Sequence, residues 1–125
     1  RTGLAGKGPH HRQRLYKMNE TSEYQIISWR DVPVQVRVRN GKERHTRPLP
    51  ARFQKAATRS AYRARAITGD AYMSAWSGGP WQTHAGNPEQ TLNEIIAQLE
   101  AAYAQERLDQ LIENKGYSEV AAHDS

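Results

Sequence analysis

The sequence predicts a small α+β domain, in which an antiparallel hairpin or sheet of two or three strands is covered by two or three helices. One stretch alternates apolar and polar residues, a strong turn signal follows it, and later stretches repeat apolar residues at helical spacing. We expect a basic extended arm at residues 1–23, a single domain at residues 24–114 and a polar tail at residues 115–125.

The composition favours a modest core. The 125 residues suit one domain, and the 37% hydrophobic content predicts a core of about 90 residues with solvated or partner-bound ends. The chain lacks a run of about 18 apolar residues, so we expect no membrane span. It also lacks cysteine, which excludes disulfides and thiolate metal sites and fits a reducing compartment.

The strands are expected in the first half of the domain. Residues 24–29 form a short β-type run, and residues 33–39 alternate strictly, as a half-buried strand does. Asn40-Gly41 is a hairpin signal, because the central residues of a type I′ turn need positive φ. A bulged or short third strand is expected over residues 42–47 at the sheet edge. A two-residue turn at Asn40-Gly41 would oppose Arg39 and Lys42, which is unfavourable, whereas a one-residue bulge would oppose Arg39 and Glu43. The residues expected to face the core are Val34, Val36 and Val38.

The first helices are expected after Pro48-Leu-Pro50. A helix over residues 51–67 would turn Phe53 and Ile67 inward and end at Gly69. Asp70 would then cap a short helix that carries Tyr72, Met73 and Trp76. Three aromatic residues are expected in the core, namely Trp29, Tyr72 and Trp76.

A loop is expected over residues 77–86, where Gly and Pro are dense. Asn87-Pro-Glu-Gln90 is a helix start with an N-cap, proline at the first position and a glutamine that reaches back. This helix is expected to continue to about Asn114 and to stop at Gly116. Ile95 and Leu99 should share one core with Phe53 and the three valines.

Charge is distributed unevenly along the chain. Residues 1–65 hold 16 Lys and Arg against 4 Asp and Glu, whereas residues 66–125 hold 2 against 9. The halves can pair with each other or present two surfaces to different neighbours. The residues assigned to partner binding are five cations of the arm, four cations that form one stripe on the first helix, and one tryptophan of the Gly/Pro loop: Arg1, Lys7, Arg12, Arg14, Lys17, Arg52, Lys55, Arg59, Arg63 and Trp81.

Two interpretations of the helical stripe stay open. Its cations can be solvated or pair internally with acidic residues of the last helix (Glu106, Asp109 and Glu113), or they can bind a partner. With Arg37 and Arg39 on the outer sheet face and with the arm, they form a candidate phosphate-binding surface. Trp81 is either a capping residue or an exposed interface anchor.

No catalytic, cofactor-binding or metal-binding residue is assigned, and we expect a protein that is not an enzyme. The five histidines form no metal-binding spacing, and His10-His11 in the arm is the closest approach to one. Gly3 to Gly8 resembles a phosphate loop only superficially, because neither a strand nor a helix start flanks it.

Three segments resemble a known family in combination: Trp29-Arg-Asp-Val-Pro-Val-Gln-Val36, Arg47-Pro-Leu-Pro-Ala-Arg-Phe-Gln54, and Asp70-Ala-Tyr72 with Trp76. They are similar to the small bacterial domains described as virulence factors, which are common in alphaproteobacteria. The resemblance covers roughly residues 24–113. It implies a compact α+β domain of uncharacterised activity and supplies no catalytic residue.

The basic arm determines the functional hypothesis. The sequence opens on Arg1 and not on Met, which fits either a truncated end or a mature end left after removal of a targeting peptide. The arginine-rich, acid-poor arm is typical of a mitochondrial import sequence and its flank. We therefore expect a non-catalytic accessory subunit on the matrix side of mitochondria, in a respiratory-chain or ATP-synthase complex. Its partners would be other protein subunits, with anionic lipid headgroups as further candidates. The alternatives are a mitochondrial ribosomal or other nucleic-acid-binding module and a free-standing bacterial regulatory or virulence-associated factor in the cytoplasm.

Overall fold

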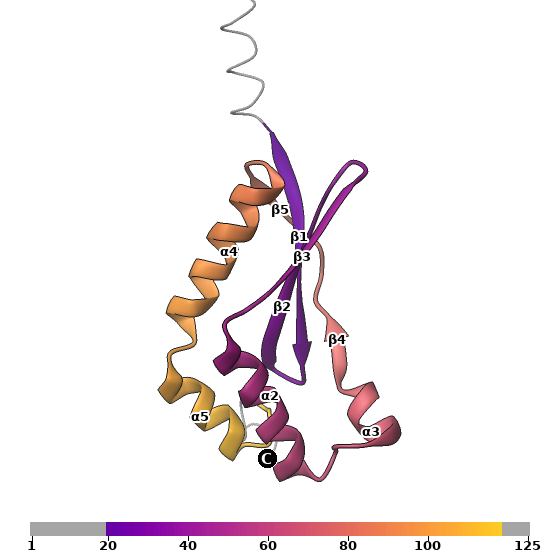
Figure 1. Ribbon diagram of the computed structural model, residues 1–125, viewed down its shortest axis with the longest axis vertical. Helices are drawn as coiled ribbons and strands as arrows, with labels where there is room; N and C mark the ends of the chain where they lie inside the picture. Colours follow the sequence, from indigo (N-terminus) through magenta and orange to yellow (C-terminus); the bar gives the residue numbers. More distant parts are fainter. Residues whose placement is uncertain (1–19, 119–125) are drawn as a thin grey trace, which may run out of the picture.

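The computed structural model describes residues 20–118 and confirms the predicted α+β class. Within these residues an antiparallel five-stranded sheet is packed against helices (Figure 1). Five strands and four helices follow one another in this order: β1 (Thr21–Trp29), β2 (Val32–Asn40), β3 (Glu43–Pro48), α2 (Ala51–Ala64), α3 (Gly69–Ser74), β4 (Trp76–Gly78), β5 (Gln82–Ala85), α4 (Pro88–Ala102) and α5 (Gln105–Glu113).

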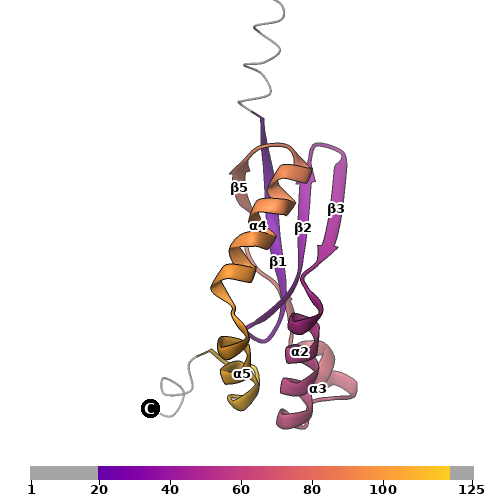
Figure 2. The same ribbon diagram turned by 60° about the vertical axis from the view of Figure 1, so that its left-hand side comes forward.

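Among the described strands, one edge of the sheet is formed by a single strand and the other is shared by two shorter ones. Its order is β3-β2-β1-β4, and β5 also pairs with β1. β4 lies opposite residues 27–29 of β1, while β5 lies opposite residues 21–24. Figure 2 shows β1, β2 and β3 side by side with α4 in front of them. Among the described strands, β3 therefore forms one edge alone.

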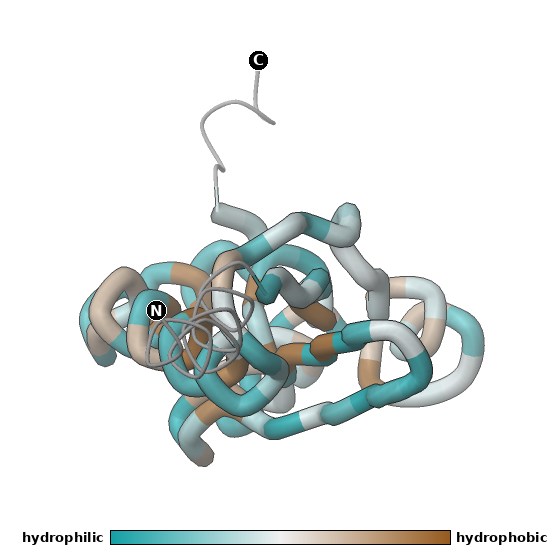
Figure 3. Tube along the Cα trace, turned by 90° about the horizontal axis from the view of Figure 1, so that it is seen from above, coloured by the Kyte–Doolittle hydropathy of each residue, from teal (hydrophilic) through white to brown (hydrophobic). Residues whose placement is uncertain are grey.

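The helices cover the valine face of the sheet, as the alternation in β2 predicts. Val36 and Val38 are buried under α4 and α2, which contribute Ile95 and Phe53 to the same core. Leu99 is partly buried against this cluster. In the view from above, hydrophobic segments lie toward the middle and hydrophilic ones along much of the outline (Figure 3).

At the end of the sheet near α5, the core is built around Trp29. Its ring is fully buried together with Leu108 and Leu111 of α5, and its Nε1 donates to the carbonyl oxygen of Tyr72 at 3.1 Å. The expectation that Trp29 belongs to the core is thus confirmed. Tyr72 and Trp76 pack against the core but are only partly buried.

The turn between β1 and β2 bonds to two distant parts of the chain. The backbone N–H of Arg30 donates to Ala75 at 2.8 Å, and that of Asp31 donates to Gly116 at 2.9 Å. The Asp31 carboxylate accepts from the N–H of Ser118 at 2.9 Å. Residues 115–118 were predicted to begin a polar tail, but these bonds tie them to the sheet.

The predicted register of the β2–β3 hairpin was wrong. Asn40 lies opposite Glu43, so the turn residues are Gly41 and Lys42, and Arg39 lies opposite Arg44 without a bulge between β2 and β3. Of the two turn residues, only Gly41 has a backbone in the left-handed region, with φ of +62°. The irregularity lies instead between β1 and β2, at Ile27 and Ser28.

The first helix ends earlier than predicted. Arg65 takes the left-handed conformation with φ of 58°, and the N–H of Ala66 bonds to Ala61 at 2.9 Å. Burial of Ala66 stabilises this end, although an arginine is an unusual residue for it. Ile67 therefore lies beyond the helix and is 42% exposed, not inward. Thr68, rather than Asp70, occupies the N-cap position of α3.

The long final helix is interrupted. α4 begins as predicted, with the reciprocal side-chain and backbone bonds between Asn87 and Gln90. It ends at Ala102, and α5 starts after two non-helical residues, Tyr103 and Ala104. The apolar spacing lapses at this point, because Glu106 and Arg107 follow where helical periodicity requires an apolar residue.

Residues 77–86 were predicted as a loop, but most of them belong to β4 and β5. These strands have only three and four residues, and the Gly and Pro residues in and between them are typical of a loop. Trp76 correspondingly begins β4 and does not lie in the preceding helix. The first strand also starts at Thr21, so part of the predicted arm pairs with β5.

The packing makes a stability prediction at Phe53, which is fully buried between α2 and the sheet. Phe53→Ala should lower the free energy of unfolding by about 3–5 kcal/mol, because it leaves a cavity in a rigid core. Urea denaturation followed by circular dichroism measures the change. The control is Tyr62→Ala on the same helix, which is 64% exposed and should change stability by less than about 0.5 kcal/mol. A Phe53→Ala loss below about 1 kcal/mol would contradict the core arrangement.

Candidate functional site

The face of the sheet turned away from the helices carries a cluster of cations. Because side chains alternate along a strand, burial of Val36 and Val38 turns Arg37 and Arg39 to the other face. Arg44 lies directly opposite Arg39 and shares that face. We define the basic sheet face by these residues and their neighbours: Glu23, Arg37, Arg39, Arg44 and Trp81, with Lys42 at the hairpin tip.

Arg39 is held in place from two sides. Its Nε donates to Glu23 at 2.7 Å, and its guanidinium lies 3.9 Å from the centre of the Trp81 ring. An ion pair that also stacks on an aromatic ring has little freedom to rotate. Trp81 is therefore partly buried and supports the basic sheet face from the β4–β5 connection.

The other cations of this face lack such partners. Arg37, Lys42 and Arg44 are exposed, and within residues 20–118 their side chains make no ion pair or hydrogen bond. Arg39 and Arg44 also face each other across the ladder, where like charges destabilise strand pairing. A local electrostatic conflict of this kind is typical of functional surfaces.

The connection between β4 and β5, which carries Trp81, is held close to β1. The side chain of Gln25 donates to the carbonyl oxygen of Gly79 at 3.0 Å. A Cβ at Gly78 would come within 2.5 Å of the same amide. Glycine at 78 thus lets the connection lie directly on β1 and bring Trp81 over the sheet.

The predicted stripe on α2 lies on the opposite side of the molecule from Trp81, because α2 packs against the valine face. Arg52 in this stripe has a structural role. Its Nη2 donates to the carbonyl oxygens of Glu100 and Tyr103, at 3.1 and 3.2 Å. These carbonyls lie at the C-terminal end of α4, where they have no partner within the helix. A cation here gives them a hydrogen-bond donor and interacts favourably with the negative end of the helix dipole.

The rest of the stripe divides between internal pairing and exposure. Arg63 pairs with Glu113 of α5 at 3.1 Å, as the internal interpretation predicts. Asp109 instead accepts from Gln105 within α5. Lys55 and Arg59 are exposed, and they line a small pocket of about 270 Å³ between α2 and α5.

A larger groove of about 750 Å³ runs between α4 and the segment that joins β3 to α2. Arg47 and Arg52 lie along it, but both already bond to α4. Arg47 donates to Asn93 at 2.7 Å and lies 3.6 Å from a carboxylate oxygen of Glu89. The cations of this groove therefore serve packing between β3 and α4.

Several predictions fall outside the described part of the chain. The five cations assigned to the arm, Arg1, Lys7, Arg12, Arg14 and Lys17, precede residue 20, as does His10-His11. Within residues 20–118, no helix is long and apolar enough to cross a membrane. Across the same residues, no group of three or more His, Asp or Glu side chains could hold a metal ion.

Sequence reasoning missed part of the basic sheet face. It turned Arg37 and Arg39 outward but did not include Lys42 and Arg44 in the site. The shifted register concealed the cluster, because the predicted bulge opposed Arg39 to Glu43, an opposite charge. The presence of Pro48 at the end of β3 could have fixed the register, since proline is tolerated only where no ladder bond is donated.

Comparison with known families gives one match. Residues 27–112 match the model of a family described as Virulence factor, which confirms the resemblance seen in the sequence. Comparison with curated proteins and with solved structures found no match.

The family match overturns the main functional hypothesis. The predicted accessory subunit of a mitochondrial respiratory-chain or ATP-synthase complex was wrong, because the family's description names virulence and no such complex. The alternative of a free-standing bacterial regulatory or virulence-associated factor fits the match better. The arm's composition was a misleading signal, since basic, acid-poor segments serve many purposes.

The structural role of Arg52 is testable by stability. Arg52→Gln should lower the free energy of unfolding by about 1–2 kcal/mol, because two helix-end carbonyls lose a charged donor. Chemical denaturation measures this loss. Lys55→Gln removes the same charge from a side chain without these bonds and is expected to change stability by less than about 0.5 kcal/mol. Equal effects of the two variants would show that Arg52 acts only through its net charge.

Proposed function

The chain belongs to the virulence factor family, and we propose that it is a free-standing bacterial virulence-associated factor that binds an acidic surface of another protein. Binding would take place on the basic sheet face. The proposal concerns binding and not catalysis, and it assigns the protein to the bacterial cytoplasm.

The observation that carries this proposal is the set of unpaired cations on an ordered, uncovered face. Arg37 and Arg44 project from neighbouring strands, and no helix among the described elements packs on this side of them. Glu23 neutralises Arg39 but neither of these two. Guanidinium groups bind carboxylates with two parallel hydrogen bonds, so two of them on neighbouring strands suit an acidic surface.

An acidic protein suits this face better than a nucleic acid does. Binding of single strands commonly uses aromatic rings on which bases stack, and one side of the Trp81 ring is already occupied by Arg39. The second half of the chain is also acidic, with nine Asp and Glu against two Lys and Arg, and would repel a long polyanion. A compact acidic surface avoids that repulsion.

The function is tested with a defined acidic probe. The probe is a fluorescent peptide of about eight alternating glutamate and valine residues, the length of an ordinary strand. Fluorescence anisotropy should show binding to the full chain that weakens as ionic strength rises from about 0.05 to 0.3 M. Arg37→Gln with Arg44→Gln should weaken binding at least about tenfold, because both unpaired guanidiniums are lost.

The matched control removes two exposed cations from the helical side. The double variant Lys55→Gln with Arg59→Gln has the same net charge as the double variant of Arg37 and Arg44. Its affinity for the peptide should stay within about threefold of that of the unmodified chain. If both double variants weaken binding equally, attraction is due to overall charge and the proposed site is wrong. Preference for a single-stranded oligonucleotide of equal charge over the peptide would favour nucleic-acid binding instead.

A further inference from the structure

We propose that β3 is a docking strand, to whose free edge an extended acidic segment of the partner protein adds as a further strand of the sheet. This inference rests on the proposed function and specifies how the partner binds. It assigns affinity to backbone hydrogen bonds along β3 and selectivity to the cations beside them.

The hydrogen-bond pattern of the hairpin identifies the free backbone groups. The N–H of Leu49 donates to the carbonyl oxygen of Val34 at 2.9 Å, and these residues lie in register with the β2–β3 ladder. In an antiparallel pair, bonded and non-bonded positions alternate. The residues of β3 that bond to β2 are therefore Glu43, His45 and Arg47. The N–H and C=O groups of Arg44 and Thr46 point away from β2.

Two sequence features agree with this assignment. Pro48 falls on a position that donates no bond to β2, where its missing N–H costs nothing. Asn40 and Glu43 flank a two-residue turn, and the residues that flank such a turn normally form a hydrogen-bonded pair. The direction of the free groups thus follows from the register at both ends of β3.

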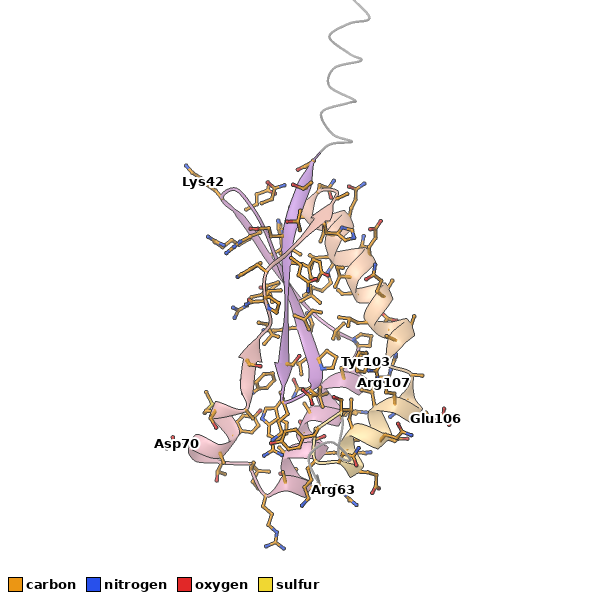
Figure 4. All side chains as sticks on the ribbon, turned by 180° about the vertical axis from the view of Figure 1, so that it is seen from behind. Lys42, Arg63, Asp70, Tyr103, Glu106 and Arg107 are labelled. Carbon is orange, nitrogen blue, oxygen red and sulfur yellow. The ribbon has the colours of Figure 1, made fainter. Side chains whose placement is uncertain are left out.

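The edge is accessible along its length. Within residues 20–118, no strand pairs with β3 on the side away from β2. All residues of β3 are exposed apart from Arg47, which is half-buried. Figure 1 shows the hairpin rising away from the helices, and Figure 4 places Lys42 at its tip, far from Arg63 along the long axis.

The side chains beside the edge select for acidic residues. On the basic sheet face, Arg44 would lie next to the added strand. Thr46 is short, so the side chain of Arg37, directly opposite it, can reach over it to the same strand. Carboxylates two residues apart on one face of an extended segment match this spacing, because alternate side chains share a face.

The same cations argue against a second copy of this chain as the occupant. Edge-to-edge pairing of two β3 strands would bring cations of both copies together on one face, and like charges on adjacent strands repel. An acidic segment meets the opposite condition. The edge is therefore protected against self-association and open to a partner of complementary charge.

Thr46→Pro tests the inference in the full chain. This substitution removes one outward N–H, leaves the net charge and the bonds to β2 unchanged, and places proline at an edge position that tolerates it. Binding of the glutamate–valine peptide should weaken at least about tenfold, because an inter-strand bond is lost and the proline ring obstructs the added strand. Thr46→Ala keeps the N–H and should bind within about threefold of the unmodified chain.

A second measurement needs no variant of the protein. The peptide is N-methylated either on its glutamates or on its valines, so that alternate N–H groups are removed. Only one edge of an added strand faces β3, so one of the two peptides should lose binding and the other should keep it. Attraction by charge alone would leave both peptides bound.

The outcomes separate the two proposals. If Thr46→Pro and both methylated peptides bind normally while the Arg37→Gln, Arg44→Gln variant does not, docking on β3 is wrong and the proposed function stands. If the arginine variant binds normally, the proposed function is wrong. A dimer in sedimentation analysis that the peptide fails to dissociate would show that a second copy occupies the edge.

Discussion

The domain is held together at the turn between β1 and β2, where three segments distant in the sequence meet. The turn donates backbone hydrogen bonds to Ala75 at the end of α3 and to Gly116, three residues beyond the end of α5, and Trp29 fills the space beneath it. Gly116 makes this approach possible, because a Cβ there would lie 3.1 Å from the Trp29 ring. The guanidinium of Arg30 covers the cluster, between the rings of Trp29 and Tyr117.

Anchoring at this turn determines which surfaces stay open. It fixes the helices to the valine face and directs the chain from α3 into β4 and β5, which cover the edge of β1. The described chain provides no comparable element for β3. A short hairpin therefore projects with one face and one edge free, and its cations lie on both. The proposed site follows from where the chain closes its sheet.

The sequence predicted the parts of the fold that depend on local pattern. Alternation identified β2, and the residues from Asn87 to Gln90 identified the start of α4, since both signals arise within a few residues. It failed where distant contacts decide the structure. β4 and β5 exist because β1 pairs with them, and the break at Tyr103 is stabilised by Arg52 from another helix. Arg44 was left out of the basic sheet face, although Arg37 and Arg39 were predicted there, because a single-residue error in register moves a side chain to the opposite face.

Electrostatics connects these observations. The basic first half and the acidic second half do pair where helices and β3 meet, through Arg63 with Glu113 and Arg47 with Glu89. Internal pairing thus neutralises part of the excess positive charge on the helical side of the sheet. Within residues 20–118 it does not reach Arg37 and Arg44, because the acidic helices lie across the sheet from them. Part of the uncompensated charge of the described residues therefore lies on the basic sheet face and beside the open edge of β3, where an acidic partner gains both ion pairs and backbone hydrogen bonds.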